Sequence, residues 1–404
     1  MDVITTPLTY IINRSIVEGE FPECWKTSKI VPIPKKGDKS IIGNYRPISC
    51  LSVPSKVLEI VIQKQLVRHF ETNSLFARHQ HGFRCHRSTV SCLIAMHDKW
   101  QREKTKENKV GIILWDNSAA FETINASILD EKLKIYQVDE RSRKWIKSYL
   151  SNRKQRVQVG ASLSQERDVD CGSPQGSALS PTLYIIQTAD IELWTSNGPE
   201  YIHGFADDTT TTTVDKEVSG LVQRMESEAN NVLSFMNSNC LVANPEKTKM
   251  MMVGDMENEE IRIGGDIIGC SKSEKLLGIE VASDLTWTKH LENTHGELLK
   301  RLGLIRRLRY KLPSSCLKLI ADGLFQSKIR YGACLFVNPI LNDRESHSGL
   351  VEKLQKVQNE LNRVLMGVKR SDRIRNKDLS EMTGLQTVNQ IACTQMLHEL
   401  RKII

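Results

Sequence analysis

The sequence lacks any long apolar run. Across its 404 residues, no apolar stretch approaches the roughly 20 residues that a membrane-spanning helix needs. The two strongest short runs, Val110–Trp115 and Leu276–Ala282, have the length of buried strands. The first residues also lack the basic segment that opens a secretory signal. These absences argue against a membrane protein or a secreted protein, and we expect an intracellular one, cytoplasmic or nuclear.

Closely spaced cysteines, internal repeats and low-complexity tracts are absent as well. The chain has ten cysteines, but no two stand at the Cys-x-x-Cys spacing of zinc and redox sites. Scattered cysteines of this kind are typical of reduced core residues, so we expect no disulfide partner. The length favours two or three packed units.

Basic residues exceed acidic ones only slightly, with 56 Lys and Arg against 48 Asp and Glu, for a net charge of +8. Two basic clusters are nevertheless free of acidic residues, one from Arg141 to Arg156 and one from Lys300 to Lys311. Such clusters suit a phosphate backbone, because counterion release supplies affinity independent of base sequence. The alternative is that each cluster is a solvated helix face, and for either cluster taken alone this is the preferred interpretation.

The apolar pattern from residue 110 to residue 253 alternates between strands and helices. Val110–Trp115 predicts a strand buried on both faces, and helices are expected over 126–150 and from Ser180. The β-prone runs 201–206 and 209–214 predict a hairpin. A helix is expected from about residue 218, with Asp215 as its N-cap. This order is typical of a split βαβ unit with helices on one sheet face.

The flanking regions carry simpler patterns. Extended chain is expected over 29–34 and 45–48, and helical stripes over 57–66 and 90–97. Beyond Trp287 the sequence predicts basic helices, with breaks near Pro313 and Pro339.

Three aspartates stand where strands end. Asp116 follows the buried strand, and Asp207 and Asp208 occupy the hairpin tip, two places that the split βαβ topology makes neighbours. Two or three carboxylates on adjacent strand ends suffice to hold a pair of Mg²⁺ ions for phosphoryl transfer. The alternative is ordinary turn chemistry, and composition and spacing leave the two readings open.

Short motifs stand in a fixed order along residues 20–290. They are Phe21–Lys26, Pro32–Asp38, Tyr45–Ser49, Gln80–Arg84, Arg87–Thr89, Asp116–Phe121, Ser173–Ser177, Phe205–Thr209, Asn244–Thr248 and Leu276–Ile279. In this order they resemble the reverse transcriptases of non-LTR (LINE-type) retrotransposons. The resemblance implies an RNA-directed DNA polymerase that extends a DNA primer on an RNA template with dNTPs and two Mg²⁺ ions, for which Mn²⁺ could substitute.

The same resemblance implies an α+β fold, a right-hand polymerase with fingers, a split βαβ (ferredoxin-like) palm and a helical thumb. The expected boundaries are a truncated N-terminal lead over 1–20, fingers and palm over 21–285, a basic thumb over 286–370 and a C-terminal helical extension over 371–404. The usual upstream endonuclease is then expected to be missing from this chain.

The family pattern also implies residue roles. Asp116, Asp207 and Asp208 would be the catalytic metal ligands, with Asp208 the weaker one. Lys247 would protonate the pyrophosphate leaving group. Arg46 would hold the incoming triphosphate.

Four further residues take roles from the same pattern. Lys36 would bind the triphosphate beside that arginine. Phe121 would stack under the deoxyribose and reject a 2′-hydroxyl, and Gln175 with Gly176 would support the nascent base pair. The alternatives are an exposed charged hairpin for Lys36 and Arg46, a solvated surface side chain for Lys247, core packing for Phe121 and a tight turn for Gln175 and Gly176.

Several positions depart from the family pattern. Asn117, Glu122 and Asn125 stand where an aliphatic residue, Asp and His are usual. A decayed copy that binds nucleic acid without polymerising is therefore the alternative hypothesis. A metal-dependent nuclease using the same carboxylates is a third, and it gains nothing from Lys36 or Phe121.

Overall fold

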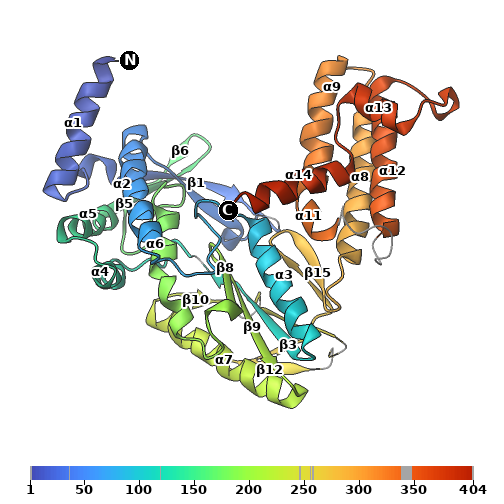
Figure 1. Ribbon diagram of the computed structural model, residues 1–404. Helices are drawn as coiled ribbons and strands as arrows, with labels where there is room; N and C mark the ends of the chain where they lie inside the picture. Colours follow the sequence, from blue (N-terminus) through green and yellow to red (C-terminus); the bar gives the residue numbers. More distant parts are fainter. Residues whose placement is uncertain are drawn as a thin grey trace. The chain divides into compact units, whose positions relative to one another are not determined.

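The computed structural model describes residues 2–35, 37–118, 120–244, 247–254, 256, 259–337 and 348–402. By their internal contacts these residues form two compact units, drawn in Figure 1. The first unit lies within residues 1–85, 112–249 and 260–268, and the second within residues 86–111, 250–259 and 269–404. Helices and sheets occur together, so the predicted α+β class is confirmed.

The first unit contains most of the strands. Its helices are α1 (Asp2–Glu18), α2 (Val53–Thr72), α4 (Ala126–Ile135), α5 (Glu140–Leu150), α6 (Ser180–Gln187) and α7 (Val218–Ser238). Its strands are β1 (Thr27–Pro34), β2 (Tyr45–Cys50), β4 (Asn117–Ser118), β5 (Arg153–Val159), β6 (Ser162–Leu163), β7 (Arg167–Val169), β8 (Ile202–Phe205), β9 (Asp208–Asp215), β10 (Val242–Ala243) and β12 (Glu260–Ile263), with most of β3 (Lys109–Trp115) and β13 (Asp266–Gly269).

One sheet of the first unit has the strand order β2-β1-β5-β6, with β7 added to β5. Strand β1 runs antiparallel to β2 and parallel to β5, and Ile33 stands opposite Arg46. The extended segments predicted over 29–34 and 45–48 are therefore confirmed, and the structure adds that they pair with each other. Arg46 therefore lies on β2, at the edge of this sheet, and is exposed.

A second sheet contains β3, β9 and β8 in that order. Strand β3 is buried along most of its length, as its unbroken apolar run predicts. Trp115 at its end donates its indole N–H to Thr211 Oγ1 on β9 over 3.0 Å. Strands β8 and β9 form the predicted hairpin, in which Phe205 stands opposite Asp208.

Helix α7 packs against β9 and β12 (Figure 1). Its apolar stripe is buried there, with Leu221, Met225 and Val232 fully covered. The prediction of Asp215 as its N-cap is wrong, because the N-cap is Glu217. Asp215 instead ends β9, and its carboxylate accepts the Glu217 N–H within a turn.

Polar side chains set where several helices begin. Ser52 caps α2 ahead of a proline in the first turn, and Asp139 caps α5 through the Ser142 N–H. Asn125, one of the departures from the family pattern, caps α4 by accepting the N–H groups of Ser127 and Ile128. The helical region predicted over 126–150 is thus two helices, α4 and α5.

The second unit is mainly helical. Its elements are α3 (Thr89–Thr105), most of β11 (Lys249–Met252), β14 (Ser273–Leu276), β15 (Ile279–Ala282), α8 (Thr288–Leu308), α9 (Ser314–Ile320), the π-helix η5 (Ala321–Gln326), α10 (Ser327–Arg330), α11 (Ala333–Phe336), α12 (Ser348–Met366), α13 (Asn376–Thr383) and α14 (Val388–Leu400). Helices α8 and α12 lie side by side (Figure 1). The break expected near Pro313 is confirmed, whereas Pro339 lies outside the described residues.

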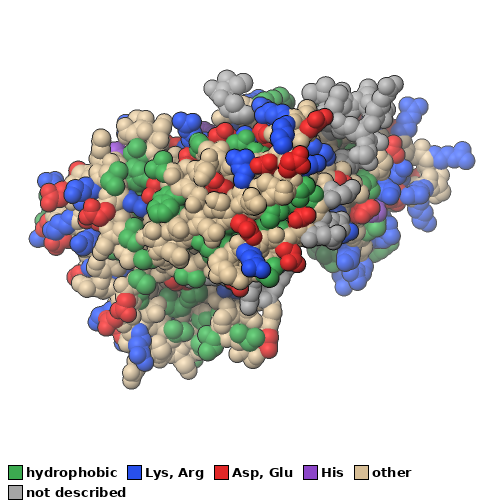
Figure 2. Space-filling view, turned by 90° about the horizontal axis from the view of Figure 1, so that it is seen from below, with side chains coloured by type: hydrophobic (Ala, Val, Ile, Leu, Met, Phe, Trp, Pro, Cys, Tyr) green, Lys and Arg blue, Asp and Glu red, His purple; other side chains and the backbone are tan. Residues whose placement is uncertain are grey.

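All ten cysteines are free, but the prediction that they are core residues is wrong for most of them. Only Cys92 is buried, and seven are exposed. Over much of the face in Figure 2, acidic and basic side chains are interspersed. No helix among the described residues is long and apolar enough to cross a membrane.

Candidate active site

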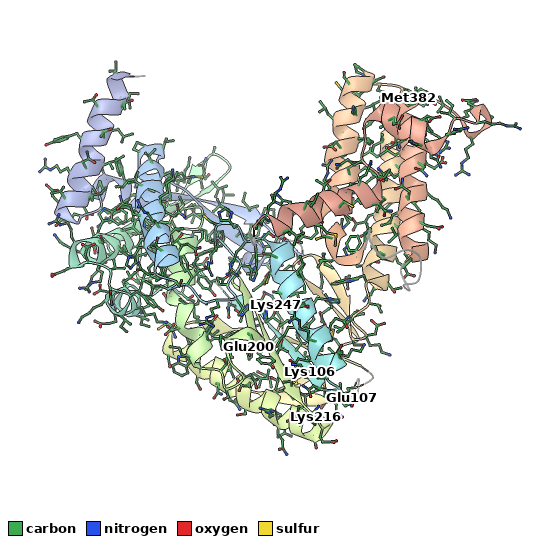
Figure 3. The ribbon with its side chains drawn as sticks, in the orientation of Figure 1. Lys106, Glu107, Glu200, Lys216, Lys247 and Met382 are labelled. Carbon is green, nitrogen blue, oxygen red and sulfur yellow. The ribbon has the colours of Figure 1, made fainter. Side chains whose placement is uncertain are left out.

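Asp116 follows directly on the buried strand β3. Its backbone carbonyl accepts the Asn244 N–H over 2.9 Å. The short strand β10, which directly precedes Asn244, pairs with β4, which directly follows Asp116. These contacts bring Lys247, labelled in Figure 3, to the carboxylate, where Nζ lies 3.2 Å from Oδ2. The Asp116 side chain is 37% exposed and remains accessible from solvent.

The hairpin tip between β8 and β9 carries the other two carboxylates. Ala206, just before Asp207, has a φ of 60°, a left-handed conformation that is uncommon for a residue with a Cβ. Asn117, on the Asp116 side, donates from Nδ2 to the Asp207 carbonyl over 3.1 Å and to the Tyr184 hydroxyl over 3.0 Å. The backbone of the hairpin tip is thereby tied to the end of β3.

Two of the three aspartates, Asp207 and Asp208, have a raised pKa. Both Asp207 and Asp208 remain open to water, but protein on several sides removes enough solvent to raise the pKa of each carboxyl. For Asp208, burial together with the charges of Asp207 and Asp116 raises the pKa to about 6. For Asp207, burial and Asp116 raise the pKa, while Arg46 lowers it. The site thus concentrates negative charge.

One cleft of about 840 Å³ gathers most of the predicted site residues. Its walls include Arg46, Asp116, Phe121, Gln175, Gly176, Asp207 and Lys247. Asp208 is not among the described residues that line it, and Lys36 lies outside the described residues. Predicted site residues as far apart in the chain as Arg46 and Lys247 therefore line one cleft.

The turn at Gln175 and Gly176 is locked to strand β2. The Ser49 N–H donates to the Gln175 carbonyl over 2.6 Å. Gly176 has a φ of 110°, and a Cβ there would lie 2.9 Å from the Ser49 carbonyl oxygen, so a side chain is excluded. The Gln175 side chain donates to Glu122 Oε1 over 2.5 Å, which fixes the amide at the cleft wall.

Phe121 lies in the same wall, with its ring edge-on to Tyr184 at 6.1 Å between ring centres. The Ser173 N–H donates to the Phe121 carbonyl over 2.8 Å. The ring is partly exposed, so it is neither a buried core residue nor a free surface side chain.

Sequence reasoning missed several contributors. Asn117 and Glu122 were noted only as departures from the family pattern, yet each bonds to a predicted site residue. Gln80 was noted only as part of a motif, but its amide bonds to the hairpin at Ala206. Gly82 in the motif Gln80–Arg84 is the available signal, because a glycine permits a close backbone approach.

The oxygen ligands at this site fit a hard divalent cation. Carboxylates and amide oxygens dominate, the donors that Mg²⁺ prefers. The buried Oδ1 of Asn117 has no hydrogen-bond partner among the described residues. As the side chains stand, however, no group of three or more His, Cys, Asp or Glu residues in the described part of the chain could hold a metal ion.

Comparison with known proteins agrees with the motifs. The chain is 25% identical over 343 residues to the RNA-directed DNA polymerase from the mobile element jockey of Drosophila melanogaster, which covers 80% of this chain and 37% of that protein. It is 27% identical over 322 residues to the probable RNA-directed DNA polymerase from transposon BS of the same species, covering 74% of this chain and 34% of that protein. The chain thus spans about a third of the length of these relatives.

A solved structure shares the fold. The structure of telomerase from Candida albicans in complex with a fragment of telomeric RNA matches with a TM-score of 0.50 and 12% identity, covering 91% of this chain and 68% of that one. Residues 33–281 match the family described as reverse transcriptase (RNA-dependent DNA polymerase). The resemblance to non-LTR retrotransposon reverse transcriptases is thereby confirmed. The chain belongs to the reverse transcriptase family.

Proposed function

We propose that this chain is the polymerase part of a non-LTR retrotransposon protein and extends a primer 3′-hydroxyl with dNTPs on an RNA template. The observation that supports it most is the single cleft in which Asp116 and Asp207 meet Arg46 and Lys247. Phosphoryl transfer needs positioning and neutralisation of charge more than covalent help from protein, and this cleft offers both.

Asp116 and Asp207 would hold two Mg²⁺ ions, with Asp208 as a weaker ligand or an orienting group. The ions, when bound, supply activation of the 3′-hydroxyl and neutralisation of the transferred phosphate, and Mn²⁺ could replace them. The raised pKa values at Asp207 and Asp208 support this assignment, because burial and neighbouring carboxylates disfavour the charged form in the absence of a cation.

Lys247 is the proton donor that we assign to the pyrophosphate leaving group. Its ammonium lies 3.2 Å from Asp116 Oδ2 and is largely exposed. Loss of this pairing during substrate binding would release the ammonium toward the triphosphate. Arg46, on strand β2, would contact the triphosphate with a planar fork of donors.

Phe121 is the residue we assign to sugar selection, because its partly exposed ring lies in the cleft wall. The Gln175 amide, oriented by Glu122, and the bare backbone of Gly176 would face the nascent base pair. In the second unit, the basic residues Arg306 and Arg307 at the end of α8 are exposed and would bind a nucleic-acid backbone.

Primer extension on an RNA template tests the proposal. Purified protein with Mg²⁺ and dNTPs should give product, and Asp207→Ala should give none although it still binds the primed template. The decayed-copy hypothesis requires both proteins to be inactive while binding persists. The structure favours the active enzyme, because Asn117 and Glu122 make bonds at the cleft instead of disrupting it.

A further inference from the structure

The segment from His79 to Arg84 forms an additional edge on the hairpin that carries Asp207. Gln80 bridges Gly204 in parallel register, although the two residues belong to distant parts of the chain. The His81 N–H donates to the Gly204 carbonyl over 2.7 Å, and the Gly204 N–H donates to the His79 carbonyl over 3.0 Å. Strand β8 therefore has a backbone partner on the side away from β9.

The Gln80 side chain reaches past this edge to the hairpin tip. Oε1 accepts the N–H of Ala206 over 3.0 Å and that of Gly82 over 2.7 Å. Nε2 donates to the Ala206 carbonyl over 3.3 Å. The amide is 8% exposed, so these contacts are sheltered from competing water. One side chain thus bonds both backbone polar groups of Ala206.

Ala206 is the residue whose conformation directs Asp207. Its φ of 60° is unfavourable for a residue with a Cβ and persists only where surrounding contacts impose it. The two bonds from Gln80 are such contacts. Two glycines make room for them, since a Cβ at Gly204 would lie 2.7 Å from Gln80 Nε2, and one at Gly82 would meet the Ala206 backbone.

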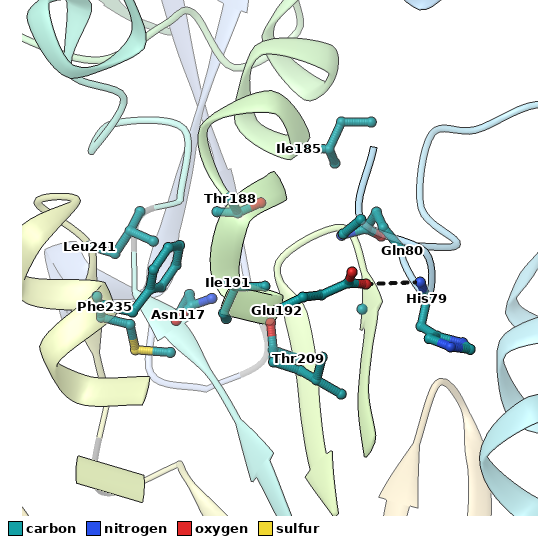
Figure 4. A pocket seen from close by; sticks show the side chains of 14 residues that line it. His79, Gln80, Asn117, Ile185, Thr188, Ile191, Glu192, Thr209, Phe235 and Leu241 are labelled. Atoms are coloured by element: carbon teal, nitrogen blue, oxygen red, sulfur yellow. Dashed lines mark hydrogen bonds between the residues drawn. The ribbon is translucent and has the colours of Figure 1, made fainter. Parts of the chain in front are cut away.

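The segment is itself anchored at both ends. Glu192 accepts the His79 N–H over 3.3 Å, the bond drawn in Figure 4, where Gln80 lies beside it in the pocket wall. At the other end, the Arg84 guanidinium pairs with Glu71 on α2 over 2.7 Å and donates to the Ala77 carbonyl over 2.8 Å. An anchored segment can hold the hairpin tip in place, which a mobile loop could not.

We propose that Gln80 is a positioning residue for polymerisation, which holds Ala206 in the left-handed conformation that presents Asp207 to the metal ions. This inference rests on the proposed function of the cleft. Gln80 does not itself line the cleft with Asp116 and Asp207, so we expect it to act through the hairpin and not by contact with substrate or metal.

Gln80→Met tests the proposal, because methionine keeps the length and volume of the side chain and removes its hydrogen bonds. The matched control is Gln187→Met. Gln187 is fully buried in the same unit, accepts the Asn125 N–H over 3.2 Å and donates to the Asn239 carbonyl over 2.9 Å. Both variants lose a buried amide, but only one loses contacts to the hairpin that carries Asp207.

Three measurements are compared in the two variants: thermal unfolding, Mn²⁺ binding by electron paramagnetic resonance, and hydrogen exchange of the Ala206 amide. We expect similar losses of thermal stability. In Gln80→Met alone, Mn²⁺ affinity and the turnover of single-nucleotide extension should fall by about tenfold or more, and exchange at Ala206 should quicken by a similar factor.

The outcome that overturns the proposal is a Gln80→Met protein whose Mn²⁺ affinity, turnover and Ala206 exchange match those of Gln187→Met. If the unaltered protein shows no primer extension, the proposed function fails. The hydrogen-exchange comparison then still decides whether Gln80 holds the hairpin.

Discussion

Replacing Gly82 with alanine should displace the hairpin that carries Asp207. A Cβ at Gly82 would lie 2.8 Å from Ala206 Cα and 3.0 Å from the Phe205 carbonyl carbon, and closer still to Ala206 N. These are backbone atoms that cannot rotate away, and ordinary contact begins near 3.4 Å. The hairpin and the Gly82 segment must therefore separate by roughly 1 Å. A displacement of that size near the reacting atoms can lower the rate about 100-fold.

Gly82→Ala should affect the rate of nucleotide extension more than it affects the stability of the fold. Overpacking of this kind costs about 1–3 kcal/mol, and Gly82 does not have a left-handed φ, so alanine adds no backbone strain of its own. Gly269→Ala is the control, because nothing lies within 4 Å of its added Cβ. Single-nucleotide extension by the folded protein is the assay. A Gly82→Ala enzyme within twofold of the Gly269→Ala enzyme would refute the reasoning.

Three other perturbations test separate parts of the account. Phe121→Ala should raise incorporation of ribonucleotides relative to dNTPs, measured in competition, and an unchanged ratio would remove the sugar-selection assignment. Neutralising Arg306 and Arg307 together should flatten the salt dependence of primed-template binding by about two units of slope, and an unchanged slope would exclude their backbone contact. Burial, aided by Lys328, lowers the pKa of His290 from its ordinary value to about 4. The neutral form is therefore favoured in the folded protein, and stability present above pH 6.5 should be lost as pH falls toward 4, by up to about 3 kcal/mol. His290→Gln should remove that part of the pH dependence in denaturant unfolding, and unchanged curves would contradict it.

Local patterns predicted the elements that carry the carboxylates. The unbroken apolar run Val110–Trp115 fits either a buried strand or a short buried helix, and its length favours the strand. The β-prone runs on either side of Asp207 and Asp208 predict the hairpin, because the aspartate pair is a turn signal between them.

Contacts between distant residues were beyond such patterns. The bonds from Gln80 to Ala206 join positions 126 apart, and nothing in either local sequence announces the partner. The same holds for Gln175 and Glu122. The Asp215 prediction failed for a different reason, since an Asp that ends a strand can bond its own turn as readily as a helix start.

The family pattern supplied what spacing could not. Spacing leaves Asp207 and Asp208 as equally good turn residues or metal ligands, and the order of motifs favours the metal-ligand interpretation. The structure then distinguishes the two neighbouring aspartates, because Asp207 lines the cleft and Asp208 does not. Asn117, expected to be a sign of decay, bonds to the Asp207 carbonyl and to Tyr184.

Binding of Mn²⁺ to the protein with a primed RNA template, a matching dNTP and a primer that lacks its 3′-hydroxyl tests the central claim most directly. Electron paramagnetic resonance should detect two bound ions per protein, and Asp116→Asn and Asp207→Asn should each abolish or greatly weaken that binding. If either variant binds both ions as tightly as the unaltered protein, these two carboxylates do not share the cations, and the polymerase mechanism assigned to the cleft is wrong.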